Sequence, residues 1–239
     1  MKKLDKHLEY VGDELQIFKN AVNWKSYFSS VLRPHIKGDV LEVGAGIGVN
    51  TKFLSKGNNH IASWSLLEPD SNLASEISKN VAPLKINLGA VINGTIDNLE
   101  NQSYDTIIYI DVLEHIENAP LEIEKIKMHL KPNGKLIILV PAYNFLFSEF
   151  DKRIGHYRRY NKSVLLKHGG TLSLQKLFYL DSIGFFASLL NKFFLKKELP
   201  SSGNIKFWDN YIINLSRVFD VLFLKSFGKS LIGIFKYEK

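Results

Sequence analysis

The chain has 239 residues, enough for one domain with a full hydrophobic core, and its 45% hydrophobic and 23% charged residues exclude a largely disordered protein. It has no cysteine, which excludes disulfides, zinc–thiolate sites and a cysteine nucleophile and fits a reducing compartment. The formal net charge of +7 permits an anionic partner, but the basic residues are spread out, so nucleic acid is not an expected partner.

Neither a secretory signal nor a membrane span is expected. Residues 1–11 are charged, and no run approaches the roughly 18 apolar residues that a spanning helix needs. The densest apolar segment, Ile183–Leu195, is interrupted by Asn191 and Lys192. We therefore expect a cytoplasmic protein that is able to touch a membrane surface.

The first half of the chain predicts alternating helices and strands. Residues 1–37 predict a helical segment that Pro34 and Gly38 close. Strands are expected at Asp39–Val43, Ile61–Leu67, Ile86–Asn93, Tyr104–Ile110 and Lys135–Val140. Helices are expected at Asn50–Lys56, Ser71–Lys79 and Pro120–Leu130, with a turn at Lys131–Gly134. This alternation indicates βαβ units and a mostly parallel sheet.

The second half is less regular. Asn161 is expected to cap a short helix that runs to His168 and ends at Gly169 and Gly170. Two further strands are expected, at Leu172–Leu180 and Ser230–Tyr237. The roughly 50 residues between them, 181–229, are too many for a loop in a compact sheet, so they must form helices of their own.

Two apolar stripes mark this predicted helical insertion. Ile183–Leu195 fits a helix packed inside the insertion or at a homodimer interface; the alternatives are a cap over an apolar ligand or a membrane contact. A second helix-spaced stripe is expected to be core, and it consists of Trp208, Tyr211, Ile212 and Leu215.

A glycine loop is the strongest local motif. Residues 40–48 read Val-Leu-Glu-Val-Gly-Ala-Gly-Ile-Gly, a strand running into a loop that opens a helix. A dinucleotide fingerprint would need Gly or Ala at position 49, which is Val49. Glu68 follows Gly48 by 20 residues at the tip of the next predicted strand, where a carboxylate can accept from both hydroxyls of a ribose. Together these residues indicate a nucleoside ligand.

Four motifs occur in order over residues 39–141. They are Leu-Glu-Val-Gly-Ala-Gly-Ile-Gly, Leu-Glu-Pro-Asp, Tyr-Asp-Thr-Ile-Ile-Tyr-Ile-Asp-Val-Leu-Glu-His-Ile-Glu and Leu-Lys-Pro-Asn-Gly-Lys-Leu-Ile-Ile-Leu-Val-Pro. This series resembles the ordered motifs of class I S-adenosylmethionine-dependent methyltransferases. The resemblance implies a Rossmann-like α/β fold with a seven-stranded mixed, mostly parallel sheet and helices on both faces. Gly-His-Tyr-Arg-Arg-Tyr at 155–160 also resembles a subgroup of bacterial methyltransferases.

The resemblance implies a role for each motif position. The glycines would pass under the methionine and ribose, Glu42 would help hold the ammonium group, and Glu68 would bind the ribose hydroxyls. The acidic residue that many members place against adenine is missing, so Thr95, a backbone group or Asp97 must serve. The implied residues for S-adenosylmethionine are Glu42, Gly44, Ala45, Gly46, Gly48, Glu68, Pro69, Thr95, Ile96, Asp111 and Val112.

The motif at 155–160 lies where a substrate loop is expected. His156 is suited to taking a proton from a hydroxyl near neutral pH, and Arg159 to binding a carboxylate or phosphate. The alternative is a structural ion-pair cluster with Glu149 or Asp151. His115 completes the catalytic candidates His156, Arg159 and His115, although a structural or cofactor-contacting role suits His115 better.

No metal is expected. A metal site could be formed by four residues with suitable side chains, Asp111, Glu114, His115 and Glu117. Asp111, however, fits a cofactor role. Glu114 and Glu117 are spaced as on a solvated helical turn, so the metal interpretation is the weaker one.

We expect one domain over 1–239, with an N-terminal helical segment 1–37, a cofactor-binding half 38–141 and an acceptor-side half 142–239. The expected reaction is methyl transfer, to oxygen rather than nitrogen, on a small-molecule, glycan or lipid-linked acceptor. Cytosine C5 methylation is excluded because it uses a cysteine nucleophile, and the stretch 111–114 lacks the motif typical of exocyclic-amine methylation in DNA. Two rival functions are an NAD(P)-dependent oxidoreductase and a non-catalytic S-adenosylmethionine-binding protein.

Overall fold

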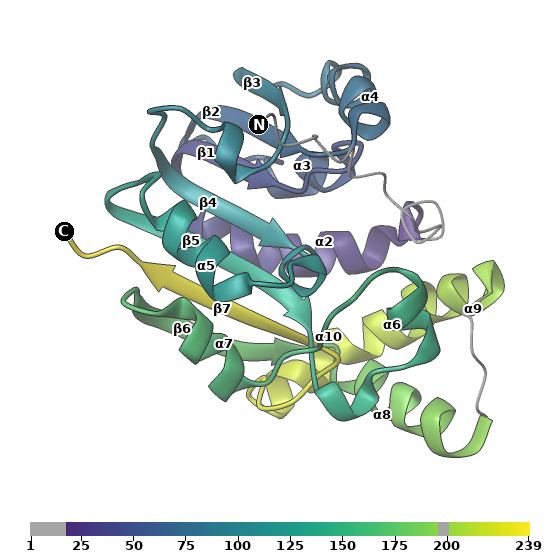
Figure 1. Ribbon diagram of the computed structural model, residues 1–239. Coiled ribbons are helices and arrows are strands. Elements are labelled where there is room, and N and C mark those ends of the chain that lie inside the picture. Colours follow the sequence, from purple (N-terminus) through teal and green to yellow (C-terminus); the bar gives the residue numbers. More distant parts are fainter. Residues whose placement is uncertain (1–17, 196–200) are drawn as a thin grey trace.

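A seven-stranded sheet forms the centre of the computed structural model, which describes residues 18–195 and 201–239 (Figure 1). Its strand order is β3-β2-β1-β4-β5-β7-β6. The strands are β1 (Gly38–Val43), β2 (Ile61–Glu68), β3 (Leu88–Asn93), β4 (Tyr104–Ile110), β5 (Leu130–Pro141), β6 (Ser173–Leu180) and β7 (Ser230–Lys236). All pairs are parallel except those of β7, which runs antiparallel to β5 and β6. The predicted mixed, mostly parallel sheet is confirmed.

Helices cover both faces of the sheet and bury two separate hydrophobic cores. The helices are α2 (Val22–Leu32), α3 (Val49–Leu54), α4 (Ser71–Val81), α5 (Ala119–Lys127), α6 (Glu149–Arg153), α7 (Lys162–Gly169), α8 (Ser182–Leu190), α9 (Ser202–Phe207) and α10 (Ile213–Leu222). One core joins the sheet to α5 and α7 through Ile123 and Leu165, and the other joins it to α2 and α10 through Phe28 and Ile213. In Figure 1, α5 and α7 lie in front of the sheet and α2 behind it.

Buried aspartates hold the insertion between β6 and β7 against the rest of the domain. This insertion contains α8, α9 and α10, with π-helical segments at Asn191–Leu195 and Trp208–Ile212. Asp209 caps the start of α2 by accepting from the backbone N–H groups of Asn23 and Trp24. Asp220 accepts from the hydroxyl of Tyr27 and from the start of α8. The prediction that this segment forms helices of its own is confirmed.

Two predictions at element level need correction. The predicted turn at Lys131–Gly134 is the irregular start of β5, where Asn133 has a φ of 62° and the register with β4 shifts. The predicted core stripe at 208–215 is confirmed only in part: Trp208 is half-buried and packs against the core, whereas Tyr211 is 62% exposed and Leu215 is 49% exposed. The insertion buries the other side of these helices, which carries Asp209 and Ile213.

The N-terminal helical prediction is confirmed only in part. Residues 1–17 lie outside the described residues, while α2 and a 3-10 turn at Arg33–His35 account for the rest of the segment. Among the helices that the structure describes, none combines the length and the hydropathy needed to cross a membrane.

Candidate functional site

A cavity of about 1430 Å³ opens at the carboxyl ends of β1, β2 and β4. Its walls come from the loop after β1, the tip of β2, the loops after β3 and β4, the segment 146–159 and the insertion. Figure 1 shows α6, α8 and α9 gathered on the side of the molecule to which the arrowheads of β4 and β5 point. This is the position at which parallel α/β sheets bind ligands.

The glycine loop after β1 lines this cavity with backbone. Gly44, Gly46 and Gly48 have φ values of 64°, 57° and 78°, which favour glycine. A Cβ atom on Gly44 would lie 2.4 Å from a methyl group of Val112. Gly48 does not line the cavity; it faces Val81 of α4, so it serves close packing between α3 and α4.

Glu68 holds the loop in place from the tip of β2. Its carboxylate accepts from the backbone N–H of Gly46 at 2.7 Å and from that of Asp70 at 2.9 Å. Burial raises the pKa of Glu68, and the two backbone donors oppose that rise. Glu68 lines the cavity, so an anionic acceptor stands beside the loop, as a ribose site requires.

The side chain of Glu42 does not lie where a contact with the ammonium group of the cofactor would require it. Its side chain is 2% exposed and does not line the cavity. One carboxylate oxygen accepts from the hydroxyl of Thr51 at 2.7 Å and from the indole of Trp64 at 3.0 Å. Burial raises its pKa to about 7. Glu42 therefore supports the loop from beneath, and its placement does not favour a contact with an ammonium group.

The other implied cofactor residues do line the cavity. They are Gly44, Ala45, Gly46, Glu68, Pro69, Thr95, Ile96, Asp111 and Val112. Thr95 and Asn98 form a capping box at the 3-10 turn after β3, while Asp97 pairs with Lys125 at 2.6 Å. Thr95 and Asp97 thus both lie in the wall of the cavity after β3.

Two lysines that no sequence motif marks face the same cavity as Asp111. Lys25 projects from α2 and Lys229 precedes β7. Burial raises the pKa of Asp111 to about 6 and lowers that of Lys25 to about 8, and the attraction between the opposite charges works against both shifts. Neither lysine belongs to a recognisable motif, so only the fold could reveal them.

Arg159 and His156 meet on the buried carboxylate of Asp151. Arg159 donates two hydrogen bonds to Asp151, at 2.8 and 2.9 Å, and Nδ1 of His156 lies 2.9 Å from it. Burial alone would raise the pKa of Asp151, but these bonds outweigh it and hold the pKa well below its ordinary value. The ion-pair alternative is therefore present in the structure. The hydrogen bonds of Arg159 to Asp151 favour a positioning role for Arg159 over direct binding of an acceptor.

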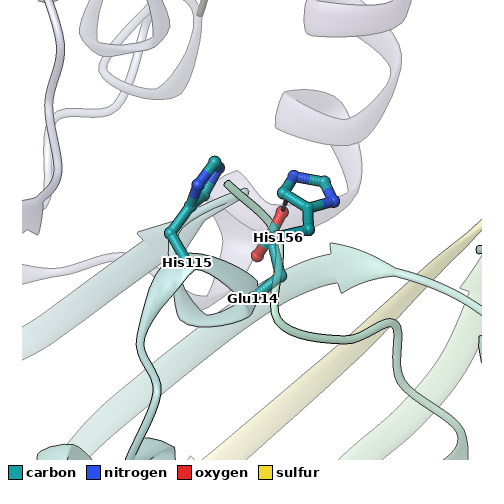
Figure 2. Close-up of side chains that lie close together, drawn as sticks. All are labelled: Glu114, His115 and His156. Carbon is teal, nitrogen blue, oxygen red and sulfur yellow. Dashed lines mark ion pairs between the residues drawn. The ribbon is translucent and has the colours of Figure 1, made fainter. Parts of the chain in front are cut away.

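Glu114, His115 and His156 converge at this end of the cavity (Figure 2). Glu114 is fully buried, which corrects the expectation of a solvated turn. Burial and the nearby Asp111 raise the pKa of Glu114 well above its ordinary value. The rings of His115 and His156 are 4.5 Å apart at 84°, and burial together with His156 lowers the pKa of His115 to about 4.

Comparisons with known proteins agree with this geometry. A family model described as "Methyltransferase domain" matches residues 19–183. A curated relative from Rickettsia typhi, named ubiquinone biosynthesis O-methyltransferase, is 29% identical over 132 residues, which cover 55% of this chain and 47% of the relative. Other such relatives from Rickettsia species are also matched over under half of their own length.

Solved structures share the fold at low sequence identity. The N-methyltransferase NodS from Bradyrhizobium japonicum, in complex with S-adenosylhomocysteine, aligns with a TM-score of 0.57 and 12% identity over 98% of this chain and 95% of that one. A phosphoethanolamine N-methyltransferase from Haemonchus contortus with S-adenosylmethionine aligns with a TM-score of 0.60 and 15% identity over 94% and 56%. At these identities the likeness concerns the fold alone.

Proposed function

Because this chain belongs to the methyltransferase domain family, we propose that it transfers the methyl group of S-adenosylmethionine to an acceptor bound beside Asp111 and His156. The observation that carries the proposal is the cavity itself. It runs without interruption from the glycine loop and Glu68 to the polar residues after β4 and β5. The family match sets aside the NAD(P)-dependent alternative, and Val49 agrees with that.

The residues at the loop end of the cavity fit the cofactor. Gly44 and Gly46 present backbone to the cavity at positive φ, a Cβ atom on Gly44 would crowd Val112, and Glu68 offers a charged acceptor for ribose hydroxyls. Thr95 and Ile96 would lie against the adenine, and Asp111 against the methionine end. When bound, S-adenosylmethionine supplies a methyl group already activated on a sulfonium sulfur. The protein then has to align the acceptor and handle its proton.

The acceptor end favours a hydroxyl as the methyl acceptor. Asp151 holds Nδ1 of His156, so Nε2 is directed toward Glu114 and the cavity, where it could receive a hydroxyl proton. The curated relatives are named O-methyltransferases, which also supports oxygen. Apolar side chains of the segment after β5 and of the insertion, such as Leu146 and Ile205, line the remaining wall. A small-molecule, glycan or lipid-linked acceptor with an apolar part suits this wall.

We also propose that the chain belongs to the subgroup of bacterial methyltransferases that its motif at 155–160 resembles, and that this motif builds the acceptor end of the cavity. It places His156 and Arg159 in the cavity wall, while Arg158 donates to the carbonyls of Ile116 and Glu117 and so ties the loop after β5 to the loop after β4. These residues therefore build the acceptor end as one unit.

Calorimetric titration with S-adenosylhomocysteine tests the cofactor assignment. Glu68→Gln keeps the size of the side chain, but it removes the charge and leaves one of the two backbone N–H donors facing an amide NH₂ group. We expect affinity to fall by roughly 30–150-fold, corresponding to about 2–3 kcal/mol. Glu76→Gln, an exposed change on α4, is the matched control and should bind as wild type. Equal dissociation constants for Glu68→Gln and the control would remove the ribose assignment.

Turnover then distinguishes an enzyme from a non-catalytic binding protein. A panel of hydroxylated acceptors is screened with a readout that detects homocysteine, with the His156→Ala variant beside wild type. Wild type should release homocysteine with at least one acceptor, and His156→Ala should lower that rate by roughly 10²–10⁴-fold. Tight binding of S-adenosylhomocysteine without any turnover across the panel would favour the non-catalytic alternative.

A further inference from the structure

The carboxyl group of Glu114 is fully buried and has no hydrogen-bond partner in any other described residue. Neither of its two oxygens accepts a hydrogen bond from another described residue. The nearest ion-pairing atom is Nε2 of His156, 3.8 Å away, which is too far for a hydrogen bond. A buried carboxyl group without partners is costly, so such a group calls for a ligand or a function.

The imidazole rings of His115 and His156 face this carboxyl group, and each ring also contacts another part of the protein. Nδ1 of His156 lies 2.9 Å from Asp151, which leaves Nε2 directed at Glu114. The ring of His115 interacts with the backbone of Ile154 and lies edge-on to the ring of His156, with centroids 4.5 Å apart. Metal-binding histidines are held in this way, with one ring nitrogen on a carboxylate or a backbone carbonyl and the other on the ion.

We propose that Glu114, His115 and His156 bind a divalent transition-metal ion at the acceptor end of the cavity. One donor atom from each residue lies within 4.8 Å of the other two (Figure 2). Ligands at about 2.0–2.2 Å from a common ion are roughly 3–3.5 Å apart, so the cluster must contract by about 1 Å. Rotation of the Glu114 side chain can supply much of that contraction, because no other described residue bonds to its carboxyl group.

The donor set selects the kind of ion. Two imidazoles and one carboxylate suit Zn²⁺ or Fe²⁺, whereas Mg²⁺ and Ca²⁺ prefer oxygen donors. Three protein ligands also leave a coordination position for a further ligand, as catalytic metal sites do. Glu114, His115 and His156 all line the cavity, so that position is accessible from the proposed acceptor site.

A catalytic role for this metal ion rests on the proposed function. A hydroxyl bound at the remaining coordination position would ionise more readily and release its proton to water. Nε2 of His156 would then be a ligand and not the proton acceptor. The sequence pattern favoured no metal, because the spacing of Glu114 and Glu117 indicated a solvated turn and nothing in the sequence brings His156 beside Glu114.

Metal binding can be measured without an acceptor or a cofactor. Tag-free protein is stripped with EDTA, dialysed and titrated with ZnCl₂ in a calorimeter; CoCl₂ is added in parallel and its visible absorption recorded. We expect saturable binding of one Zn²⁺ per chain and a Co²⁺ spectrum typical of nitrogen and oxygen ligands. Glu114→Gln, His115→Ala and His156→Ala should each weaken Zn²⁺ binding by at least about 10-fold.

Two controls separate this inference from failures of folding and of the proposed function. His60→Ala removes an exposed histidine far from the cluster in sequence and should bind Zn²⁺ as wild type. Each variant is also titrated with S-adenosylhomocysteine, and retained affinity shows an intact fold. If the histidine variants fail to fold, the isosteric Glu114→Gln decides. The proposal is overturned if wild type binds no Zn²⁺, or if Glu114→Gln binds it as tightly as wild type, whatever the result with S-adenosylhomocysteine.

Discussion

Replacing Glu42 by Gln should stabilise the fold at neutral and alkaline pH. In the native state Glu42 is buried beneath the glycine loop, and burial raises its pKa from 4.5 to about 7. Between these two values the unfolded chain ionises this carboxyl group while the folded chain keeps it protonated. Its contribution to stability is therefore fully present below pH 4.5 and is lost as pH rises through 7.

The magnitude follows from the size of the shift. A rise from 4.5 to about 7 corresponds to about 3 kcal/mol of stability lost at high pH. Gln is neutral at every pH, and its amide oxygen can accept the same bonds from Thr51 and Trp64. The stability advantage of Glu42→Gln over wild type should thus be below about 1 kcal/mol at pH 5 and reach about 3 kcal/mol at pH 8.

Urea denaturation at pH 5 and pH 8 measures this advantage, and subtracting wild type cancels the other titrating groups. Glu76→Gln, at an exposed position, should differ from wild type by the same amount at both pH values. The reasoning fails if Glu42→Gln shows a pH-independent difference or is the less stable protein at pH 8. The same variant should keep its affinity for S-adenosylmethionine; a tenfold or greater loss would restore the ammonium role that the placement of Glu42 does not favour.

Gly44→Ala should weaken cofactor binding by roughly tenfold or more, since φ is 64° and the new Cβ atom would meet Val112 at 2.4 Å. Equilibrium dialysis showing wild-type affinity would contradict a close backbone approach at this position. Asp151→Asn should cost about 3 kcal/mol of stability in thermal or urea unfolding, because the buried partner of Arg159 loses its charge; an unchanged melting curve would refute the ion-pair reasoning. Asp209→Ala should lower stability by about 1–2 kcal/mol through loss of the α2 cap. Faster amide exchange at Trp24 would locate that loss, and unchanged exchange there would speak against the capping role.

The sequence alone determined the sheet and the glycine loop that lines the cavity. Parallel strands buried on both faces appear as continuous apolar runs, and for this reason the prediction for Tyr104–Ile110 coincides with β4. The glycine loop could be predicted because positive φ angles demand glycine locally. The number of residues between β6 and β7 was enough to predict the helices of the insertion. Each of these features depends on residues close together in the chain.

Only the tertiary structure decided which side chains face the cavity and which are buried. The direction of the Glu42 side chain depends on Trp64 from another strand, and Lys25 reaches the cavity because Asp209 anchors α2 from the insertion. Glu114 and His156 share a site because β5 and the segment after it return the chain to the end of β4. Side chains become buried or paired where segments distant in the sequence pack together, and a local sequence pattern does not predict which segments these are.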